Sequence, residues 1–170
     1  MNRFEDMLCI RPIGVIHSPF KELSGMPIQP GGAKDVKGYI DLYDVYSEGL
    51  KDLGGFSHLI LLYHFHKSQG YSLVVKPFLD TEPRGLFATR APRRPNPIGI
   101  SIVRLASVAE NRVHIIDVDV LDGTPLFDIK PYVPCFDAKT EACSGWLEGK
   151  SGNASHTVSD GRFTTGSSQD

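Results

Sequence analysis

The strongest local restriction on the backbone comes from residues 84–101, which read RGLFATRAPRRPNPIGIS. Each proline in this stretch fixes its own φ and keeps the preceding residue away from the helical region. Ala91, Arg94 and Asn96 are therefore expected to be extended or turning. The sequence predicts a stiff loop through which no helix runs. We call residues 84–97 the Arg-Pro loop.

The Arg-Pro loop also concentrates positive charge. Its four guanidiniums would repel one another unless an anion or an electron-rich group lay among them. They belong to Arg84, Arg90, Arg93 and Arg94. A solvated loop whose arginines pair with scattered carboxylates is the ordinary alternative. The density of prolines favours a site, because a loop without a function seldom needs so much stiffening.

Strand-like segments follow one another at short intervals through the chain. They cover residues 9–17, 38–43, 57–66, 73–77, 98–108, 112–121 and 126–133. The most hydrophobic of them, residues 57–66, predicts a central strand buried on both faces. A helix is predicted over residues 46–53, ending at Gly54, and strong turns near Glu110 and at residues 122–125. The pattern favours a mainly β fold, a small closed or nearly closed β-barrel.

Length and composition suit one well-buried domain. The chain has 170 residues, is 41% hydrophobic and carries a formal net charge of -2. We expect the barrel domain over residues 8–150. Residues 151–170 are rich in Gly, Ser and Thr and predict a polar, weakly ordered C-terminal tail.

The chain lacks the features of a membrane or secreted protein. Its apolar runs fall short of the roughly 18 residues of a membrane span, and its first residues lack the layout of a signal peptide. We therefore expect a cytoplasmic protein with neither a membrane nor DNA as partner. The slightly acidic balance argues against a generally basic nucleic-acid surface and leaves room for a local basic patch.

Cysteine and histidine spacing offers no metal or disulfide pattern. Cys9, Cys135 and Cys143 are odd in number and widely spaced, so we expect packed thiols. His64 and His66 would share one strand face, but a third and a fourth ligand have no obvious source. No metal is therefore expected.

Four blocks carry a resemblance to a known family. They are GVIHSPF (14–20), GFSHL (55–59), FATRAPRRPNPIGIS (87–101) and LDGTPLFDIKPY (121–132). In this order, over roughly residues 10–137, they resemble the signature blocks of the TsaA-like family, which includes the TrmO-type tRNA methyltransferases. The resemblance implies a small β-barrel, usually dimeric, that binds S-adenosyl-L-methionine without a Rossmann domain. It also implies methylation of N6 of threonylcarbamoyladenosine at position 37 of tRNA.

The resemblance also implies where the cofactor binds. The positions that match the family's cofactor contacts are Pro30, Gly31, Gly32, His66, Lys67, Arg90, Ile100, Asp122, Gly123 and Thr124. Their chemistry is compatible, because glycines admit close backbone approach and an aspartate accepts hydrogen bonds from ribose hydroxyls. The chain has no G-x-G-x-x-G fingerprint, so loops of another kind must hold a nucleotide-like cofactor. Without the resemblance, residues 122–125 would be interpreted as a hairpin turn.

The predicted catalytic set is Asn96, Arg94 and Tyr132. Methyl transfer mainly requires that donor and acceptor be aligned and water excluded. The Asn96 amide and the adjacent backbone carbonyl offer acceptors for the amino protons of adenine, with a turn-capping role for Asn96 as an equal alternative.

A second set of residues is predicted to bind the substrate. Asp128 and Lys130 alternate with Tyr132 along one strand face, which lines the same cleft or is an ordinary solvated face. Arg84 and Arg93, together with Arg94, supply the densest local positive charge for RNA phosphates.

The expected partners are a tRNA anticodon loop and a second copy of the chain. We expect a symmetric homodimer with the Arg-Pro loops near the interface. Bacterial members of the family carry an additional C-terminal domain where this chain has a short tail, which leaves the substrate open. The alternative function is a non-catalytic S-adenosyl-L-methionine- or RNA-binding barrel module.

Overall fold

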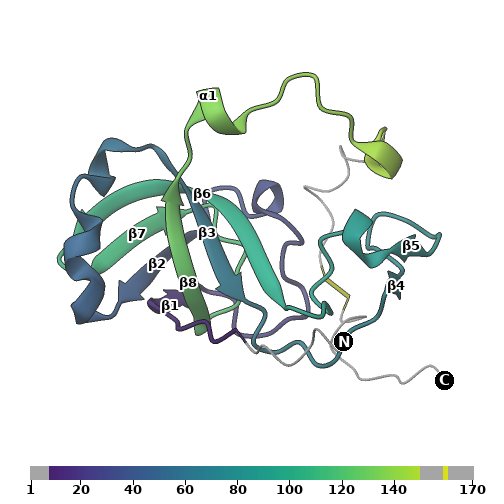
Figure 1. Ribbon diagram of the computed structural model, residues 1–170, viewed down its shortest axis with the longest axis horizontal. Coiled ribbons are helices and arrows are strands. Elements are labelled where there is room, and N and C mark those ends of the chain that lie inside the picture. Colours follow the sequence, from purple (N-terminus) through teal and green to yellow (C-terminus); the bar gives the residue numbers. More distant parts are fainter. Residues whose placement is uncertain (1–7, 150–158, 161–170) are drawn as a thin grey trace.

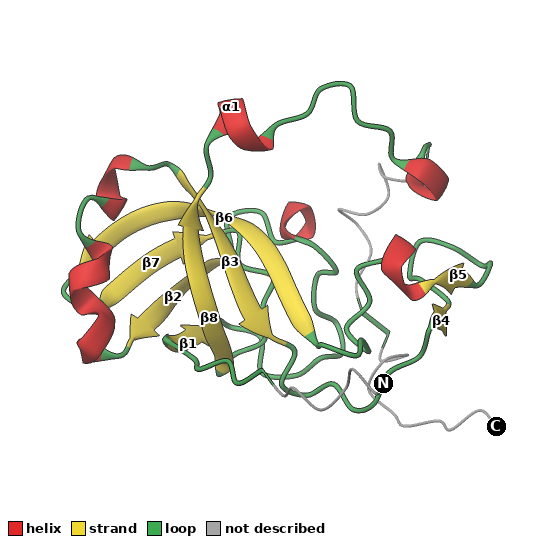
Figure 2. Ribbon diagram, in the orientation of Figure 1, coloured by secondary structure: helices red, strands yellow, loops and turns green. Residues whose placement is uncertain are grey.

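The computed structural model describes residues 8–149, 159 and 160, and its centre is a closed barrel of six strands (Figures 1 and 2). The strands are β1 (Gly14–His17), β2 (Lys37–Leu42), β3 (His58–His64), β6 (Ile98–Ala109), β7 (Arg112–Ile116) and β8 (Thr124–Pro131). Each pairs antiparallel with its neighbours in the order β1-β2-β7-β6-β3-β8, and β8 pairs back with β1. The predicted mainly β barrel is confirmed.

One face of each strand fills the barrel. On β3 the inward side chains Leu59, Leu61 and Tyr63 are buried, while the alternate residues are only half-buried. The prediction of a strand buried on both faces is therefore wrong, because a closed barrel has a single interior. The remaining core side chains in the strands belong to Ile16, Ile40, Leu42, Val103, Val113, Ile115 and Leu126.

Residues 117–121 close one end of the barrel. The predicted strand 112–121 stops at Ile116 because the next residue, Asp117, has a left-handed backbone with φ of 69°. The chain then crosses the barrel end, where Val118 and Val120 join the core. We call this segment the cap and the end that it covers the capped end.

The opposite end is covered by two short 3-10 helices in place of the predicted helix 46–53. They are η2 (Asp44–Leu50) and η3 (Leu53–Gly55). Asp52, with φ of 65°, interrupts the helical path between them. Leu50 and Leu53 pack against the barrel core, which explains why the segment has an apolar periodicity without forming an α-helix.

A small lobe stands beside the barrel (Figure 2). It contains β4 (Val74–Val75), β5 (Arg84–Gly85) and η4 (Leu86–Ala88). The other short helices are η1 (Pro30–Gly32), α1 (Pro134–Asp137) and η5 (Gly145–Leu147). After α1 the chain arches from the barrel to the lobe (Figure 1), where the Trp146 indole N–H donates to the Ala88 carbonyl at 2.8 Å.

Two further predictions concern the periphery. The thiols of Cys9, Cys135 and Cys143 are exposed, so the prediction of packed thiols is wrong; each cysteine lies outside the strands of the barrel. Most of the predicted tail lies outside the described residues, but Ser159 exchanges backbone hydrogen bonds with Gly25 and Met26. None of the helices in the described part of the chain has the length and apolar character needed to cross a membrane.

Gly99 is required by the packing of Tyr63. The Tyr63 ring lies against the backbone of Gly99, and a Cβ at position 99 would stand 2.2 Å from the ring. Real contacts of this kind do not occur, so either the ring or the strand has to move. Tyr63 is held inside the barrel by an edge contact with Phe65 and by a hydrogen bond from its hydroxyl group.

We therefore expect Gly99→Ala to destabilise the protein by at least about 2 kcal/mol, as overpacked cores do. The free energy of unfolding, measured by urea denaturation, checks this. Gly54→Ala is the matched control, because nothing lies within 4 Å of a Cβ there. Equal stability of the two variants would contradict the packing argument.

Candidate functional site

The capped end of the barrel brings together segments that are far apart in sequence. β3 ends where β6 begins, with His64 opposite Ile98, and β1 ends where β8 begins, with Ile16 opposite Thr124. The Arg-Pro loop is fixed to the end of β3 by the Phe65 N–H, which donates to the Pro97 carbonyl at 2.8 Å. Residues after β3, the Arg-Pro loop, the cap and the turn at 122–124 therefore meet here.

Residues 122–124 form a turn that carries an anchored carboxylate. It is not a hairpin turn, because β8 pairs with β1 and β3 and not with the preceding strand β7. Gly123 has φ of 77°, which favours glycine. Asp122 accepts from Lys21 Nζ at 2.7 Å and from the Ser18 N–H at 3.1 Å, and His17 Nδ1 lies at 3.2 Å. The hydrogen bond from Lys21, followed by those from Ser18 and His17, lowers the pKa of Asp122. Asp122 is therefore ionised at neutral pH.

Thr124 connects this turn to the end of β3. Its hydroxyl group donates to the Leu121 carbonyl at 2.7 Å and lies 3.3 Å from His66 Nδ1. Burial, and then the charge of Lys67, lowers the pKa of His66. His66 is therefore neutral at pH 7 and offers a ring nitrogen at the capped end.

A buried chain of hydroxyl groups leads from the barrel interior to the cap. The Ser101 hydroxyl donates to Asp119 Oδ1 at 2.6 Å, and the Tyr63 hydroxyl lies 3.0 Å from Ser101 Oγ. Since the single proton of Ser101 points to Asp119, Tyr63 donates to Ser101. Burial raises the pKa of Tyr63 and raises that of Asp119 to about 6, and Arg90 acts on both in the opposite direction.

The sequence did not predict this series of hydrogen bonds, because its pattern placed Asp119 in a continuous strand. The available signal was the alternation of Asp117 and Asp119 with the apolar residues Val118 and Val120. Carboxylates in that pattern can face solvent or a polar end of the core, and only the fold distinguishes the two.

Two arginines of the Arg-Pro loop have hydrogen-bond or ion-pair partners within the protein. Arg84 pairs with Asp80 at 2.7 Å and lies over the Trp146 ring at 5.7 Å. Arg94 Nη1 donates to three loop carbonyls, the shortest bond being 3.0 Å to Thr89, and its guanidinium lies 5.7 Å from the exposed Phe87 ring. These contacts make the loop rigid.

The other two loop arginines have fewer protein partners. Arg90 is exposed and forms no ion pair with a described residue, although its charge lowers the pKa of Asp119. Arg93 is half-buried, and its Nε is buried without a hydrogen-bond partner. Asn96 is exposed; its carbonyl accepts from the Ile98 N–H, but its side chain caps no turn among the described residues.

The predicted catalytic residue Tyr132 follows β8, and the predicted substrate residues Asp128 and Lys130 lie on that strand. The Tyr132 N–H donates to the His58 carbonyl at the start of β3, roughly 20 Å along the strand from the capped end. Lys130 pairs with Asp128 at 2.7 Å. One protomer therefore does not bring Tyr132 to Asn96.

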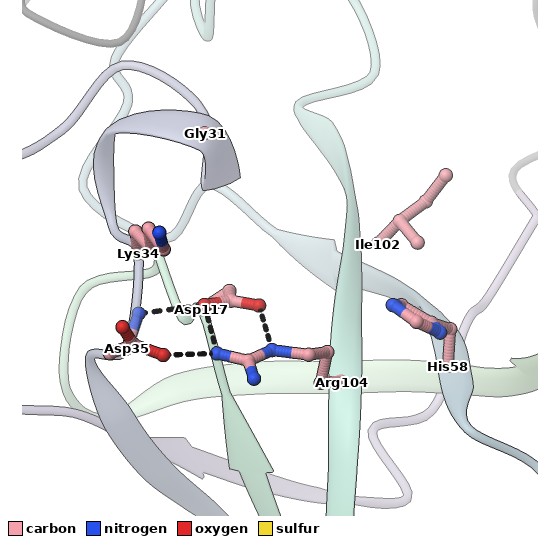
Figure 3. Close-up of a pocket in the computed structure, with 7 residues that line it drawn as sticks. All are labelled: Gly31, Lys34, Asp35, His58, Ile102, Arg104 and Asp117. Atoms are coloured by element: carbon pink, nitrogen blue, oxygen red, sulfur yellow. Dashed lines mark hydrogen bonds and ion pairs between the residues drawn. The ribbon is translucent and has the colours of Figure 1, made fainter.

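Gly31 lies beside a separate surface hollow of about 340 Å³ (Figure 3). Figure 3 shows Arg104 bonded to both Asp35 and Asp117. The bond from Arg104 lowers the pKa of Asp117 and raises that of the arginine. The charges of this ion-pair cluster are satisfied within the protein, so its role is to anchor the cap.

Two further observations complete the geometry. Ile100 is exposed on the outer face of β6, next to Ile102, which lines the same hollow as Gly31. Among the described residues, no group of three or more His, Cys, Asp or Glu side chains could hold a metal ion. Six of the ten predicted cofactor residues thus gather at the capped end, and four lie on or near the outer face of β6. The first six are His66, Lys67, Arg90, Asp122, Gly123 and Thr124.

Comparisons with known proteins show which family the chain belongs to. Residues 15–138 match the family model of the tRNA-methyltransferase O N-terminal domain. A probable S-adenosyl-L-methionine-binding protein of Pyrococcus abyssi is 54% identical over 92% of this chain and 85% of that protein. The tRNA (adenine(37)-N6)-methyltransferase of Escherichia coli is 39% identical over 80% of this chain, which spans 62% of the enzyme's length. A crystal structure of TrmO from Pseudomonas aeruginosa has a TM-score of 0.70 at 38% identity and covers 83% of this chain and 63% of its own.

Ionised Asp119 should reduce stability. Its pKa is about 6 in the folded protein against 3.8 ordinarily, so the folded state holds the proton more tightly. Stability is lost as pH rises from about 4 to 6, by about 3 kcal/mol in total. We expect Asp119→Asn to remove this loss and to be more stable than wild type at pH 7 but not at pH 4.

Urea denaturation at pH 4 and pH 7 checks this expectation. Asp52→Asn is the control, because Asp52 is exposed and asparagine tolerates its left-handed backbone. If Asp119→Asn and wild type lose the same free energy between the two pH values, Asp119 does not carry the charge that burial opposes.

Proposed function

The chain belongs to the tRNA-methyltransferase O N-terminal domain family, and we propose that it transfers a methyl group from S-adenosyl-L-methionine to N6 of adenine 37 of a tRNA. The carrying observation is the meeting of His66, Arg90 and Thr124 at the capped end, since these positions match the family's cofactor contacts. The finer part of the proposal is a threonylcarbamoylated adenosine in the anticodon loop as acceptor, in the cytoplasm.

The capped end fits the chemistry of this cofactor. S-adenosyl-L-methionine combines a cationic sulfonium and ammonium with a carboxylate, a ribose and an adenine. The exposed cations Arg90 and Lys67 suit the carboxylate, and Thr124 and Gly123 suit the polar ribose. When bound, the cofactor supplies a methyl carbon that is already electrophilic.

The chain's own contribution is to hold the acceptor and to exclude water. We assign the Asn96 side chain to the amino group of adenine, because its amide is exposed at the capped end and bonds to no described residue. Arg94 positions this amide, since its bonds to the carbonyls of Thr89 and Ala91 fix the loop that carries Asn96. An aligned acceptor lowers the barrier mainly by reducing the entropy lost in the reaction.

We assign tRNA phosphates to the arginines of the Arg-Pro loop. Arg84 and Arg94 use only part of their guanidiniums in the bonds to Asp80 and the loop carbonyls. Arg93 adds a third charge with a buried Nε that lacks a partner. Because the chain has a net charge of -2, RNA binding depends on such a local cluster.

We also propose a homodimer through the outer face of β6. Ile98, Ile100 and Ile102 project from it with 40%, 45% and 42% of their surface exposed. Opposite them on β3 stand the half-buried Ile60 and Leu62, so the apolar surface is continuous across two strands. A contiguous apolar patch of this kind favours a self-complementary contact between copies. The patch adjoins the Arg-Pro loop.

A second candidate function has its own support. The relative from Pyrococcus abyssi is named as a probable S-adenosyl-L-methionine-binding protein. A relative from Archaeoglobus fulgidus, of which this chain covers 99%, is named as an S-adenosyl-L-methionine-binding protein. The longer relative from Escherichia coli is named as a methyltransferase. A barrel that binds the cofactor without catalysis is therefore the alternative.

Methyl transfer tests the proposed function. We expect the purified chain to incorporate radiolabelled methyl groups from S-adenosyl-L-methionine into tRNA, with the label on N6 of adenine 37 after nuclease digestion. Unmodified and threonylcarbamoylated tRNA are compared as substrates. Cofactor binding by calorimetry without any transfer to either tRNA would favour the binding module.

Sedimentation tests the dimer. We expect wild type to sediment as a dimer at micromolar concentration and Ile102→Lys as a folded monomer, because a charge buried in an apolar interface is costly. Val45→Lys is the control, since Val45 is equally apolar and 81% exposed on η2. A monomeric wild type, or a dimeric Ile102→Lys, would contradict this interface.

A further inference from the structure

One ionisable group at the capped end has no role in the assignments above. Asp119 sits at the centre of the cap, half-buried, with Oδ1 held at 2.6 Å by the Ser101 hydroxyl. Its other carboxylate oxygen accepts no hydrogen bond from the side chain of another described residue. The carboxylate is thus fixed in orientation by Ser101, with the backbone N–H of Asp119 itself as a further donor, and one oxygen is bonded by no other described side chain.

Two other acidic groups near this end already have hydrogen-bond and ion-pair partners. Asp122 is bonded by Lys21 and Ser18, and Asp117 by Arg104 and the Asp35 N–H. A carboxylate whose charge is neutralised by a lysine or an arginine is a weak proton acceptor. Asp119 is therefore the carboxylate in the described part of this end that remains able to take a proton.

The proposed reaction needs such a group. The amino nitrogen of adenine carries hydrogen, and a nitrogen that gains a methyl group must lose a proton. We infer that Asp119 is a catalytic residue that accepts this proton from N6, oriented by Ser101 and Tyr63. The nitrogen forms its bond to the methyl carbon, the carbon–sulfur bond breaks with its electrons remaining on sulfur, and the N–H proton passes to the open carboxylate oxygen. This inference rests on the proposed function.

The surroundings suit a general base. Tyr63 from β3 and Ser101 from β6 face the carboxylate, and Arg90 of the Arg-Pro loop is the charged group that acts on it. Burial raises the pKa of Asp119 to about 6, while the Ser101 bond, the bond from its own backbone N–H and the charge of Arg90 lower it. A base in this range is ionised at neutral pH and still takes up a proton readily. The charge also opposes folding, which is typical of a group retained for chemistry.

His66 is the rival base at this end. It is neutral at pH 7, and since the Thr124 hydroxyl donates to the Leu121 carbonyl, His66 Nδ1 donates to Thr124 and Nε2 is able to take a proton. Asp119 differs in its fixed orientation and in its link through Ser101. The two alternatives predict different pH profiles for the variants.

The test compares wild type, Asp119→Asn, Ser101→Ala, His66→Gln and the control Asp52→Asn in methyl transfer to tRNA at saturating cofactor, from pH 5 to 8. For Asp119→Asn we expect kcat to fall about 100-fold, with the KM for tRNA and the calorimetric affinity for S-adenosyl-L-methionine within about twofold of wild type. The acidic limb of kcat near pH 6 should disappear. In Ser101→Ala the acidic limb should move to higher pH. The hydrogen bond from Ser101 lowers the pKa of Asp119, so its removal raises that pKa.

Three results with the Asp119→Asn variant would overturn the inference. The first is an Asp119→Asn variant as active as wild type, and the second is an acidic limb that persists in it and is lost in His66→Gln. The third is a loss of cofactor affinity that accounts for the loss of rate, which would make Asp119 a cofactor ligand. If Asp119→Asn does not fold, an unshifted limb in Ser101→Ala decides against the inference. A wild type that binds the cofactor but leaves tRNA unmethylated overturns the proposed function, and this inference with it.

Discussion

The orientation of Asp119 depends on a packing contact in the barrel core, between the Tyr63 ring and the backbone of Gly99. Because residue 99 has no side chain, the ring crosses from β3 onto β6 inside the barrel. Its hydroxyl group then reaches Ser101, which holds Asp119. A larger residue at position 99 would displace the ring and with it the polar chain. The core of the barrel therefore sets the orientation of a carboxylate at its surface.

At the capped end, burial destabilises one ionised carboxylate and ion pairs stabilise two others. Asp119 is held in a position where burial opposes its charge, whereas Asp117 and Asp122 are ionised at little cost because Arg104 and Lys21 pair with them. The ion pairs with Arg104 also tie the cap to β6 and to the loop at Asp35. Exposed pairs of this kind contribute little each, but here they fix the segment that carries Asp119.

Much of this architecture follows from sequence patterns. Alternating apolar residues in short runs predict strands, and strands without helices between them predict a barrel, as observed. Residues 89–97 form no helix or strand, as their prolines predict, because prolines restrict the backbone locally. The prediction is wrong for residues 84–88, where β5 and the 3-10 helix η4 lie before the first proline of the run. The resemblance of four blocks identified the family, and six of the ten positions it implied for the cofactor meet at one end of the barrel.

Other features depended on the fold itself. The end of β7 at Ile116 depends on a left-handed residue, Asp117, that a strand pattern cannot reveal. The partners of the loop arginines also could not be predicted, because backbone carbonyls and Asp80 become available only when the loop folds. Asp119 was missed for the same reason, since its partners come from β3 and β6. A single sequence contains almost no signal for polar contacts between residues that are far apart in the chain.

The central claim is that the capped end, and not the hollow beside Arg104, receives the methyl donor. A crystal structure with S-adenosylhomocysteine, the demethylated product, tests it most directly. The account predicts the ligand's sulfur close to Asp119, with contacts to His66, Arg90 and Thr124. A ligand seated between Lys34, His58 and Arg104, with the capped end empty, would contradict it.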